Sequence, residues 1–326
     1  MKPRPGSWEH DILEAADRLD GMVRHTPVLA VDGAQLGGAG RLSLKLELLQ
    51  HSGSFKARGA TNFMLANRIG PAGVVAASGG NHGAAVAWAA SRLGHRAAIF
   101  VPTIASPAKV ERLRRYGADV HQVGAVYAEA LAASRELEAE TGATPIHAYE
   151  DRAVMAGAAT VGRELERQAG PLDTVLVACG GGGLAGGIAA WLGGRTRVVA
   201  CETEGTATFA GARAAGRPVP VAVTGVAADA LGATQIGDLA WQRLAEADAI
   251  SVLVTDAEVA AARAELWDRF RLVTEPAAAV PVAALLAGRY RPAADEHVGV
   301  VVCGANTDLA PLPLPDAPSP FPGPGD

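Results

Sequence analysis

The sequence predicts an α/β protein in which parallel sheets are flanked by helices. Seven short apolar runs alternate along the chain with stretches of helical periodicity. Continuous apolar runs are typical of strands buried on both faces, as in parallel sheets. Parallel strands need crossover connections, and the intervening helical stretches supply them. The predicted strands are residues 73–77, 97–101, 119–123, 174–178, 197–201, 250–254 and 298–302.

Helices are predicted between these strands because apolar residues recur there every three or four positions. Asp256 is expected to cap the last helix, since aspartate accepts hydrogen bonds from the first amides of a helix. The opening segment, MKPRPGSWEHDILEAADRL, predicts an acidic amphipathic helix instead of an apolar signal region, which favours a cytoplasmic protein. The predicted helices are residues 83–93, 108–116, 126–139, 155–167, 184–192 and 257–270.

Composition excludes several classes of protein. Hydrophobic residues make up 49% of the chain and charged residues 19%, so disorder over most of it is excluded. The 29 basic and 34 acidic residues form no block of like charge, so neither nucleic acid nor an anionic membrane is an expected partner. The three cysteines have the spacing of neither a disulfide framework nor a zinc site. We interpret Cys179 and Cys201 as small buried strand residues.

One uncharged stretch, residues 174–194, is long enough to cross a bilayer. It contains eight glycines, four of them consecutive, which would interrupt a helix. The β-branched residues at its start are typical of a strand. We therefore predict a strand, a glycine loop and a helix there.

The 326 residues suggest about two domains. A first series of strands ends near Thr144 and a second begins near Thr174. From these series and the resemblance described below, we expect a large domain made of residues 1–72 and 150–310, with a small domain, residues 73–149, inserted into it. The last 16 residues contain seven prolines, so residues 311–326 are expected to be an extended or disordered tail.

A glycine-rich loop between a predicted strand and a predicted helix is the first chemical signal. Amides in such a loop, together with the helix N-terminus, can hold a phosphate. The stretch also satisfies G-x-G-x-x-G from Gly181, and Glu202 ends the next strand, where a dinucleotide fold places its ribose-binding acid. This region alone is therefore also compatible with an NAD-dependent dehydrogenase. The loop residues are Gly180, Gly181, Gly182, Gly183 and Leu184.

A second glycine-rich loop, SGGNHG at residues 78–83, also lies between a strand and a helix. The dinucleotide interpretation explains only one of the two loops. Asn81 offers a donor and an acceptor, which suits a ring hydroxyl or a carboxylate, although a turn asparagine can also simply cap a helix. His82, beside a helix start, is more often structural than catalytic.

The third signal is Lys56. The chain has only four lysines, and this one lies in SGSFKARGA, among small residues and one aromatic. A desolvated amine in such surroundings can act as a nucleophile and form a Schiff base. The alternative, a solvated surface lysine, fits these neighbours poorly.

Taken together, SGSFKARGA, SGGNHGAAVA, CGGGGLAGG and VVCGAN resemble the serine/threonine dehydratase and serine racemase group of fold type II pyridoxal-phosphate enzymes. The resemblance extends from about Arg24 to Asn306. It implies a two-domain fold like that of the tryptophan synthase β subunit, with pyridoxal 5'-phosphate between the domains. A homo-oligomer, in the simplest case a dimer, is also expected.

The resemblance implies that Lys56 carries the cofactor as a Schiff base and, once released by a substrate amine, removes the α-proton. Cys303 would face the pyridine nitrogen. A neutral thiol there leaves less of the carbanion charge delocalised into the ring, which favours expulsion of a β-substituent. The enamine released would hydrolyse to a 2-oxo acid and ammonia. Other implied cofactor contacts are Phe55, Asn81, Gly180, Gly181, Gly182, Gly183 and Leu184. The implied substrate-carboxylate contacts are Ser78, Gly79, Asn81 and His82.

Two departures from the family limit this picture. Some relatives bind a divalent cation with a glutamate and an aspartate six residues later; here Glu202 matches the first, but Thr208 replaces the second, so Glu202 is only a candidate ligand. Racemisation in the racemase needs a serine where this chain has Gly79. We therefore expect a threonine/serine dehydratase. A serine or hydroxyaspartate racemase or dehydratase, a β-replacement synthase and, outside the family, a dehydrogenase remain alternatives.

Overall fold

The computed structural model describes residues 4, 6–38 and 40–307. Contacts divide the chain into two compact units. The first unit comprises residues 1–24 and 50–158, and the second comprises residues 25–49 and 159–326.

The predicted inserted domain, residues 73–149, falls inside the first unit. The division into a large and a small domain at the predicted boundaries remains a prediction. The proline-rich tail predicted from residue 311 lies outside the described residues.

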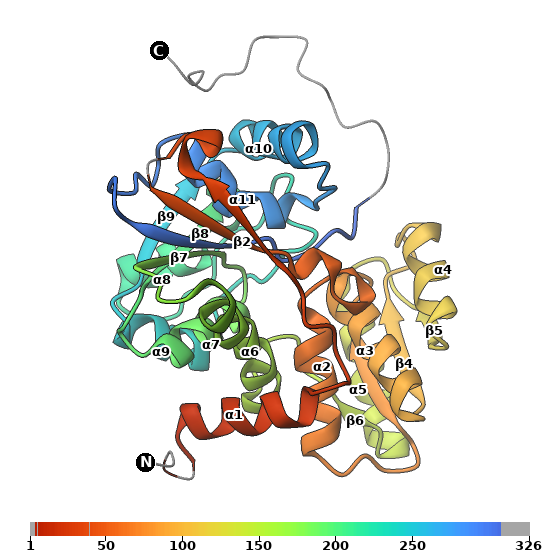
Figure 1. Cartoon of the computed structure of the whole chain (residues 1–326). Helices are drawn as coiled ribbons and strands as arrows, with labels where there is room; N and C mark the ends of the chain where they lie inside the picture. Colours follow the sequence, from red (N-terminus) through yellow and green to blue (C-terminus); the bar gives the residue numbers. More distant parts are fainter. Residues whose placement is uncertain (1–3, 5, 39, 308–326) are drawn as a thin grey trace. The chain divides into compact units, whose positions relative to one another are not determined.

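The first unit contains a four-stranded parallel sheet with the order β5-β4-β3-β6 (Figure 1). Ala97, Ile99 and Val101 of β4 belong to one core cluster with the buried apolar side chains of the alanine-rich helix α3. The strands are β3 (Val74–Ala77), β4 (Ala97–Val101), β5 (Asp119–Gln122) and β6 (Thr144–Pro145). The helices are α1 (Trp8–Leu19), α2 (Lys56–Ala66), α3 (Asn81–Leu93), α4 (Pro107–Arg115) and α5 (Tyr127–Thr141), and α6 (Arg152–Ala169) runs from this unit into the second.

The second unit contains a six-stranded sheet with the order β1-β2-β10-β7-β8-β9 (Figure 1). Only the β1–β2 pair is antiparallel. Its strands are β1 (Val28–Asp32), β2 (Arg41–Lys45), β7 (Thr174–Ala178), β8 (Arg197–Thr203), β9 (Ile250–Val254) and β10 (His297–Val301). Its remaining helices are α7 (Gly183–Leu192), α8 (Thr208–Ala215), α9 (Asp238–Glu246), α10 (Asp256–Phe270) and α11 (Pro276–Leu286).

All seven predicted strands are present, and the prediction of parallel sheets flanked by helices is confirmed. The main difference at a strand end is β8, which continues two residues further, to Thr203. The predicted cap of α10 is wrong: Thr255, not Asp256, is the N-cap, and its hydroxyl accepts from the Glu258 amide at 3.2 Å. Threonine and glutamate three residues apart form a capping box here, which makes Asp256 the first helical residue.

Elements that lack a clear periodic pattern were not predicted. β6 has only two residues, and β1 is partly exposed although it begins with four apolar residues. Helix α11 is almost entirely apolar, and residues 277–286 are all buried. A helix buried on every side has no amphipathic periodicity to detect.

The uncharged stretch at residues 174–194 forms β7, the glycine loop and α7, as predicted. Among the described residues, no helix combines the length and apolar character needed to cross a membrane.

Candidate active site

In the second unit, sheet register brings the glycine loop and Cys303 to the same sheet edge. Strand β10 lies parallel to β7, with Val298 opposite Thr174 and Val300 opposite Leu176. Because parallel neighbours end at one edge, the loop after β7 and Cys303 after β10 lie at that edge, where ligands bind in open α/β sheets. Cys303 is 3% exposed. Its predicted place facing a pyridine nitrogen remains a proposal.

The glycine loop ends at the N-terminus of α7. Gly182 is the N-cap and has a φ of 84°, a left-handed conformation that favours glycine. A Cβ at this position would lie 2.6 Å from the Ala240 Cβ, so a side chain would also collide with α9. No side chain among the described residues caps α7. Its first amides therefore remain available to an anion, which fits a phosphate group.

Glu202, near the end of β8, is fully buried and its carboxylate is bound by the start of α8. It accepts hydrogen bonds from the Phe209 amide at 2.7 Å and the Ala210 amide at 2.9 Å. Burial raises the pKa of Glu202 to about 7, against the opposing effect of these hydrogen bonds. The Thr208 hydroxyl lies 3.1 Å from Glu202 Oε1 and 2.5 Å from the Gly180 carbonyl. Both carboxylate oxygens thus have protein partners, so this carboxylate helps to hold the start of α8 beside the end of β8.

The other two cysteines are buried in the same sheet. Burial raises the pKa of the Cys179 thiol well above its usual value and also raises that of Cys201. A thiol that stays protonated is neither a nucleophile nor a metal ligand. The interpretation of Cys179 and Cys201 as small buried residues agrees with this environment.

In the first unit, Lys56 is the first residue of α2 and is half-buried. Its Nζ donates a hydrogen bond to the Ala148 carbonyl at 2.6 Å and lies 5.1 Å from the centroid of the Phe55 ring. A ring and a backbone carbonyl on the amine replace part of its water shell. These surroundings are those expected for a reactive lysine rather than a solvated one.

The loop after β3 leads directly into α3, which begins at Asn81. The Ser78 hydroxyl accepts a hydrogen bond from the Gly80 amide at 3.3 Å, which closes the turn. A Cβ on Gly83 would lie 1.8 Å from the Ser78 carbonyl oxygen, so only glycine permits this close approach. By contrast, a Cβ on Gly79 would meet nothing closer than 3.4 Å. Gly79 therefore has space for a small side chain that it lacks.

The side chain of His82 has a structural role. The imidazole is buried, and its Nε2 lies 2.8 Å from the Ile146 carbonyl. Burial, reinforced by the charge of Lys56, lowers the pKa of His82 to about 3. This arrangement favours the structural alternative over a contact between the His82 side chain and a substrate.

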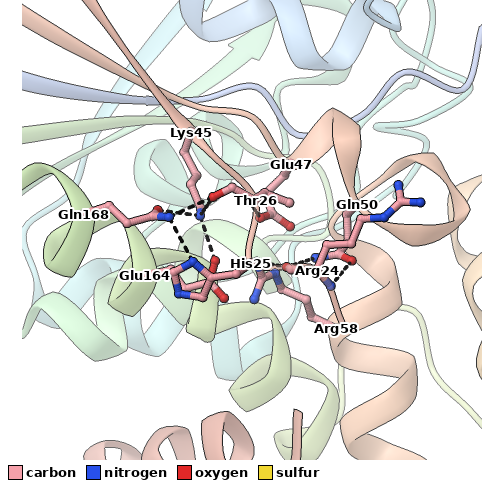
Figure 2. A network of polar contacts seen from close by, with 9 residues as sticks. All are labelled: Arg24, His25, Thr26, Lys45, Glu47, Gln50, Arg58, Glu164 and Gln168. Carbon is pink, nitrogen blue, oxygen red and sulfur yellow. Dashed lines mark hydrogen bonds and ion pairs between the residues drawn. The ribbon is translucent and has the colours of Figure 1, made fainter. Parts of the chain in front are cut away.

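A second buried lysine, Lys45, has a different environment. In the second unit, its Nζ donates to the Thr26 carbonyl at 2.7 Å, Glu164 Oε2 at 2.7 Å and Gln168 Oε1 at 2.8 Å (Figure 2). Lys45 is 0% exposed. An ammonium group has three donors, and all three are used, so this lysine has no lone pair to offer. Of these two lysines, only Lys56 has the environment of a nucleophile.

The predicted site residues therefore form two groups. The first unit holds Phe55, Lys56, Ser78, Gly79, Asn81 and His82, and the second holds Gly180, Gly181, Gly182, Gly183, Leu184 and Cys303. Each group is brought together within its own unit. Sequence reasoning missed two contributors, the Ala148 carbonyl beside Lys56 and the Thr208 hydroxyl on the glycine loop. Backbone acceptors carry no residue signal, and β6, the strand that precedes residue 148, is too short to be predicted.

Comparisons with known proteins identify the family of this chain. The profile of the pyridoxal-phosphate dependent enzyme family matches residues 19–304. The chain is 38% identical to phenylserine dehydratase from Ralstonia pickettii, over 90% of this chain and 91% of the relative. It is 35% identical to L-threonine ammonia-lyase from Geobacter sulfurreducens, over 91% of this chain and 75% of the relative. The structure of maize serine racemase matches with a TM-score of 0.86 and 32% identity, covering 93% of this chain and 94% of the racemase chain.

The chain therefore belongs to the fold type II pyridoxal-phosphate dependent enzyme family, whose members include dehydratases and racemases. Its cofactor is pyridoxal 5'-phosphate. The amides at the start of α7, which no described side chain caps, fit its phosphate, and the environment of Lys56 fits the covalent attachment of its aldehyde. The family assignment removes the support for the dehydrogenase alternative.

The contacts of Glu202 lead to a prediction about metal dependence. We expect turnover to fall by less than about twofold after prolonged dialysis against EDTA, because Thr208 supplies a neutral oxygen where a second carboxylate would offset a divalent charge. The measurement is turnover before and after dialysis, with residual metal determined by elemental analysis. A large loss of turnover that magnesium or calcium restores would instead show that the enzyme depends on a divalent cation and that its ligands have been assigned wrongly.

Proposed function

We propose that this protein is an ammonia-lyase that removes the β-hydroxyl group of L-threonine and L-serine and yields a 2-oxo acid and ammonia. The observation that carries the proposal is the environment of Lys56, an amine at a helix start with an aromatic ring and a backbone carbonyl as neighbours. The similarity to an L-threonine ammonia-lyase and a phenylserine dehydratase supports the same class of reaction.

When bound, pyridoxal phosphate supplies an electron sink that makes the α-proton of an amino acid acidic. Lys56 would remove that proton with its Nζ, the α-carbon electron pair would expel the β-hydroxyl, and the protonated Lys56 or the cofactor phosphate would give the hydroxyl the proton with which it leaves as water. The released enamine tautomerises to an imine, and hydrolysis of the imine gives the 2-oxo acid and ammonia. The amides of the loop at residues 78–82 and the Asn81 side chain bind the substrate carboxylate. The neutral thiol of Cys303 would face the pyridine nitrogen and would favour this elimination over reactions that need a fully protonated ring.

Gly79 favours elimination over racemisation. Racemisation needs a proton donor on the face of the α-carbon opposite Lys56, at roughly hydrogen-bond distance. Gly79 has no side chain to donate, although the loop has space for one. A water molecule in its place lacks the fixed position that makes general acid catalysis effective.

The test is a substrate panel with the purified holoenzyme. L-threonine, L-serine, 3-hydroxyaspartate and 3-phenylserine are incubated separately, the 2-oxo acid is identified and the amino acid is separated by chiral chromatography. We expect 2-oxobutyrate from threonine and pyruvate from serine, with D-serine formed at least about a hundredfold more slowly than pyruvate. A Gly79→Ser variant should gain racemisation, and Gly70→Ser, in the loop before β3 where a Cβ would meet nothing within 4 Å, is its control.

The panel also separates the alternatives. D-serine at a rate comparable to pyruvate would make the protein a racemase. If only 3-hydroxyaspartate or 3-phenylserine is turned over, the assigned reaction stands and the assigned substrate changes. Cysteine formed from an activated serine and sulfide would favour a β-replacement synthase. A cytoplasmic location and a homodimer remain expectations, which cell fractionation and light scattering can address.

A further inference from the structure

The Ala148 carbonyl, which accepts a hydrogen bond from the Lys56 amine, belongs to a short segment that two histidine rings hold in place. This segment, residues 146–150, connects β6 to the region before α6 in the first unit. His147 binds the segment from within, and His82 binds it from the start of α3. Ala148, between them, provides the oxygen that lies 2.6 Å from Lys56 Nζ.

His147 folds its own chain into a turn. Its Nδ1 lies 2.8 Å from the Glu150 amide nitrogen and 3.3 Å from the Tyr149 amide nitrogen. Backbone amides can only donate, so Nδ1 is the acceptor and the neutral ring carries its proton on Nε2. The ring also packs edge-on against Tyr149, with centroids 4.8 Å apart at an interplanar angle of 82°. The turn therefore depends on one nitrogen of one ring.

His82 supplies the second attachment with the opposite polarity. The Ile146 oxygen can only accept, so His82 Nε2 carries the proton in this 2.8 Å contact. The Ala148 carbonyl thus lies between two attachments. Two residues before it, the Ile146 carbonyl accepts from His82, and two residues after it, the Glu150 amide donates to His147. The His147 attachment needs a neutral imidazole, because its Nδ1 must accept, whereas the His82 attachment needs a proton on Nε2.

The charges around the two rings keep them neutral near pH 7. Partial burial and the charge of Lys56 lower the pKa of His147, Asp151 opposes this effect, and Arg135 adds to it. His82 faces Lys56 and His147, and its pKa is lowered to about 3. A charged His147 would carry a proton on Nδ1 and would repel the Glu150 amide.

We propose that His147 and His82 are positioning residues. They hold the Ala148 carbonyl where it accepts a hydrogen bond from the Lys56 amine whenever that amine is not joined to the cofactor. This inference rests on the proposed function only in making Lys56 the base. A lysine side chain has many rotamers, and a fixed acceptor selects one of them. When one N–H of the Lys56 amine is bonded to the Ala148 carbonyl, the nitrogen lone pair can point in fewer directions. This restriction helps to orient the lone pair for proton transfer.

A matched pair of variants tests the role of His147. The side-chain oxygen of asparagine can occupy the place of Nδ1, whereas glutamine reaches the place of Nε2. We expect His147→Asn to keep kcat within about threefold and His147→Gln to lower kcat roughly tenfold with KM changed less than about twofold, because the amine acts after the substrate has bound. His95→Gln, in the loop between α3 and β4, is the control and should leave both constants unchanged.

A readout that needs neither cofactor nor substrate comes from the cofactor-free enzyme. Nitrogen chemical shifts should show His147 protonated on Nε2 alone. The rate at which trinitrobenzenesulfonate modifies Lys56, followed by peptide mass, should rise at least about threefold in His147→Gln, because loss of the carbonyl acceptor lowers the pKa of the amine. The asparagine variant should react like the wild type.

Equal loss in the asparagine and glutamine variants, or no change in either, would overturn the proposal. If both fail to fold, the complementary pair at His82 replaces them: His82→Gln keeps a donor near Nε2 and should exceed His82→Asn in kcat and match the wild type more closely in Lys56 labelling. Failure of the proposed function has a different signature, since the wild type would then lack lyase activity on every substrate while the labelling pattern persisted.

Discussion

Replacing Lys56 with alanine is expected to remove the near-visible absorbance of the lysine-bound cofactor and to lower turnover by at least about a thousandfold. The amine is both the point of attachment and the base, and alanine supplies neither. The absorbance spectrum of the purified variant, before and after borohydride treatment, and the rate of 2-oxo acid formation are the measurements.

Lys109→Ala is the matched control, since Lys109 lies on α4 in the same unit. This variant should keep both the spectrum and the activity. Peptide mass spectrometry of the borohydride-treated wild type should find the cofactor on the peptide that contains Lys56. Cofactor attached to Lys45 or Lys109 instead would show that the reactive lysine has been assigned wrongly.

The second large effect concerns stability and the Lys45 network. Lys45→Met should lower the free energy of unfolding by about 3–5 kcal/mol, because it leaves the Glu164 carboxylate, 8% exposed, without its cation. The Thr26 carbonyl and Gln168 lose a donor in the same change. Urea unfolding of the holoenzyme, followed by circular dichroism, measures the loss.

Two comparisons make this prediction specific. Arg115→Met removes an exposed ion pair with Glu111 and should change stability by less than about 1 kcal/mol. The double variant Lys45→Met with Glu164→Leu should be more stable than the sum of the single changes implies, because no charge is left buried alone. Equal effects at the buried and the exposed pair would contradict the structural role assigned to Lys45.

The sequence by itself determined the parallel α/β class, the positions of seven strands and the family. Most of those strands carry continuous apolar runs, and two of the runs, in β3 and β7, are followed by glycine-rich loops. Lys56 was also identified from sequence, because small residues and one aromatic surround it in the chain itself. In each case the signal lies within about ten consecutive residues.

The tertiary structure decided which side chains act on which neighbours. Lys45 and Lys56 are both lysines in or beside buried elements, yet only the fold surrounds Lys45 with three acceptors, two of them from residues more than one hundred positions away. Glu202 matched a ribose-binding acid or a cation ligand in sequence, and only the start of α8 shows that its oxygens are engaged. His147 had no sequence signal, since its role depends on one ring nitrogen facing two amides. Such contacts join segments that are distant in the sequence, or depend on which ring nitrogen carries the proton. Local sequence patterns encode neither.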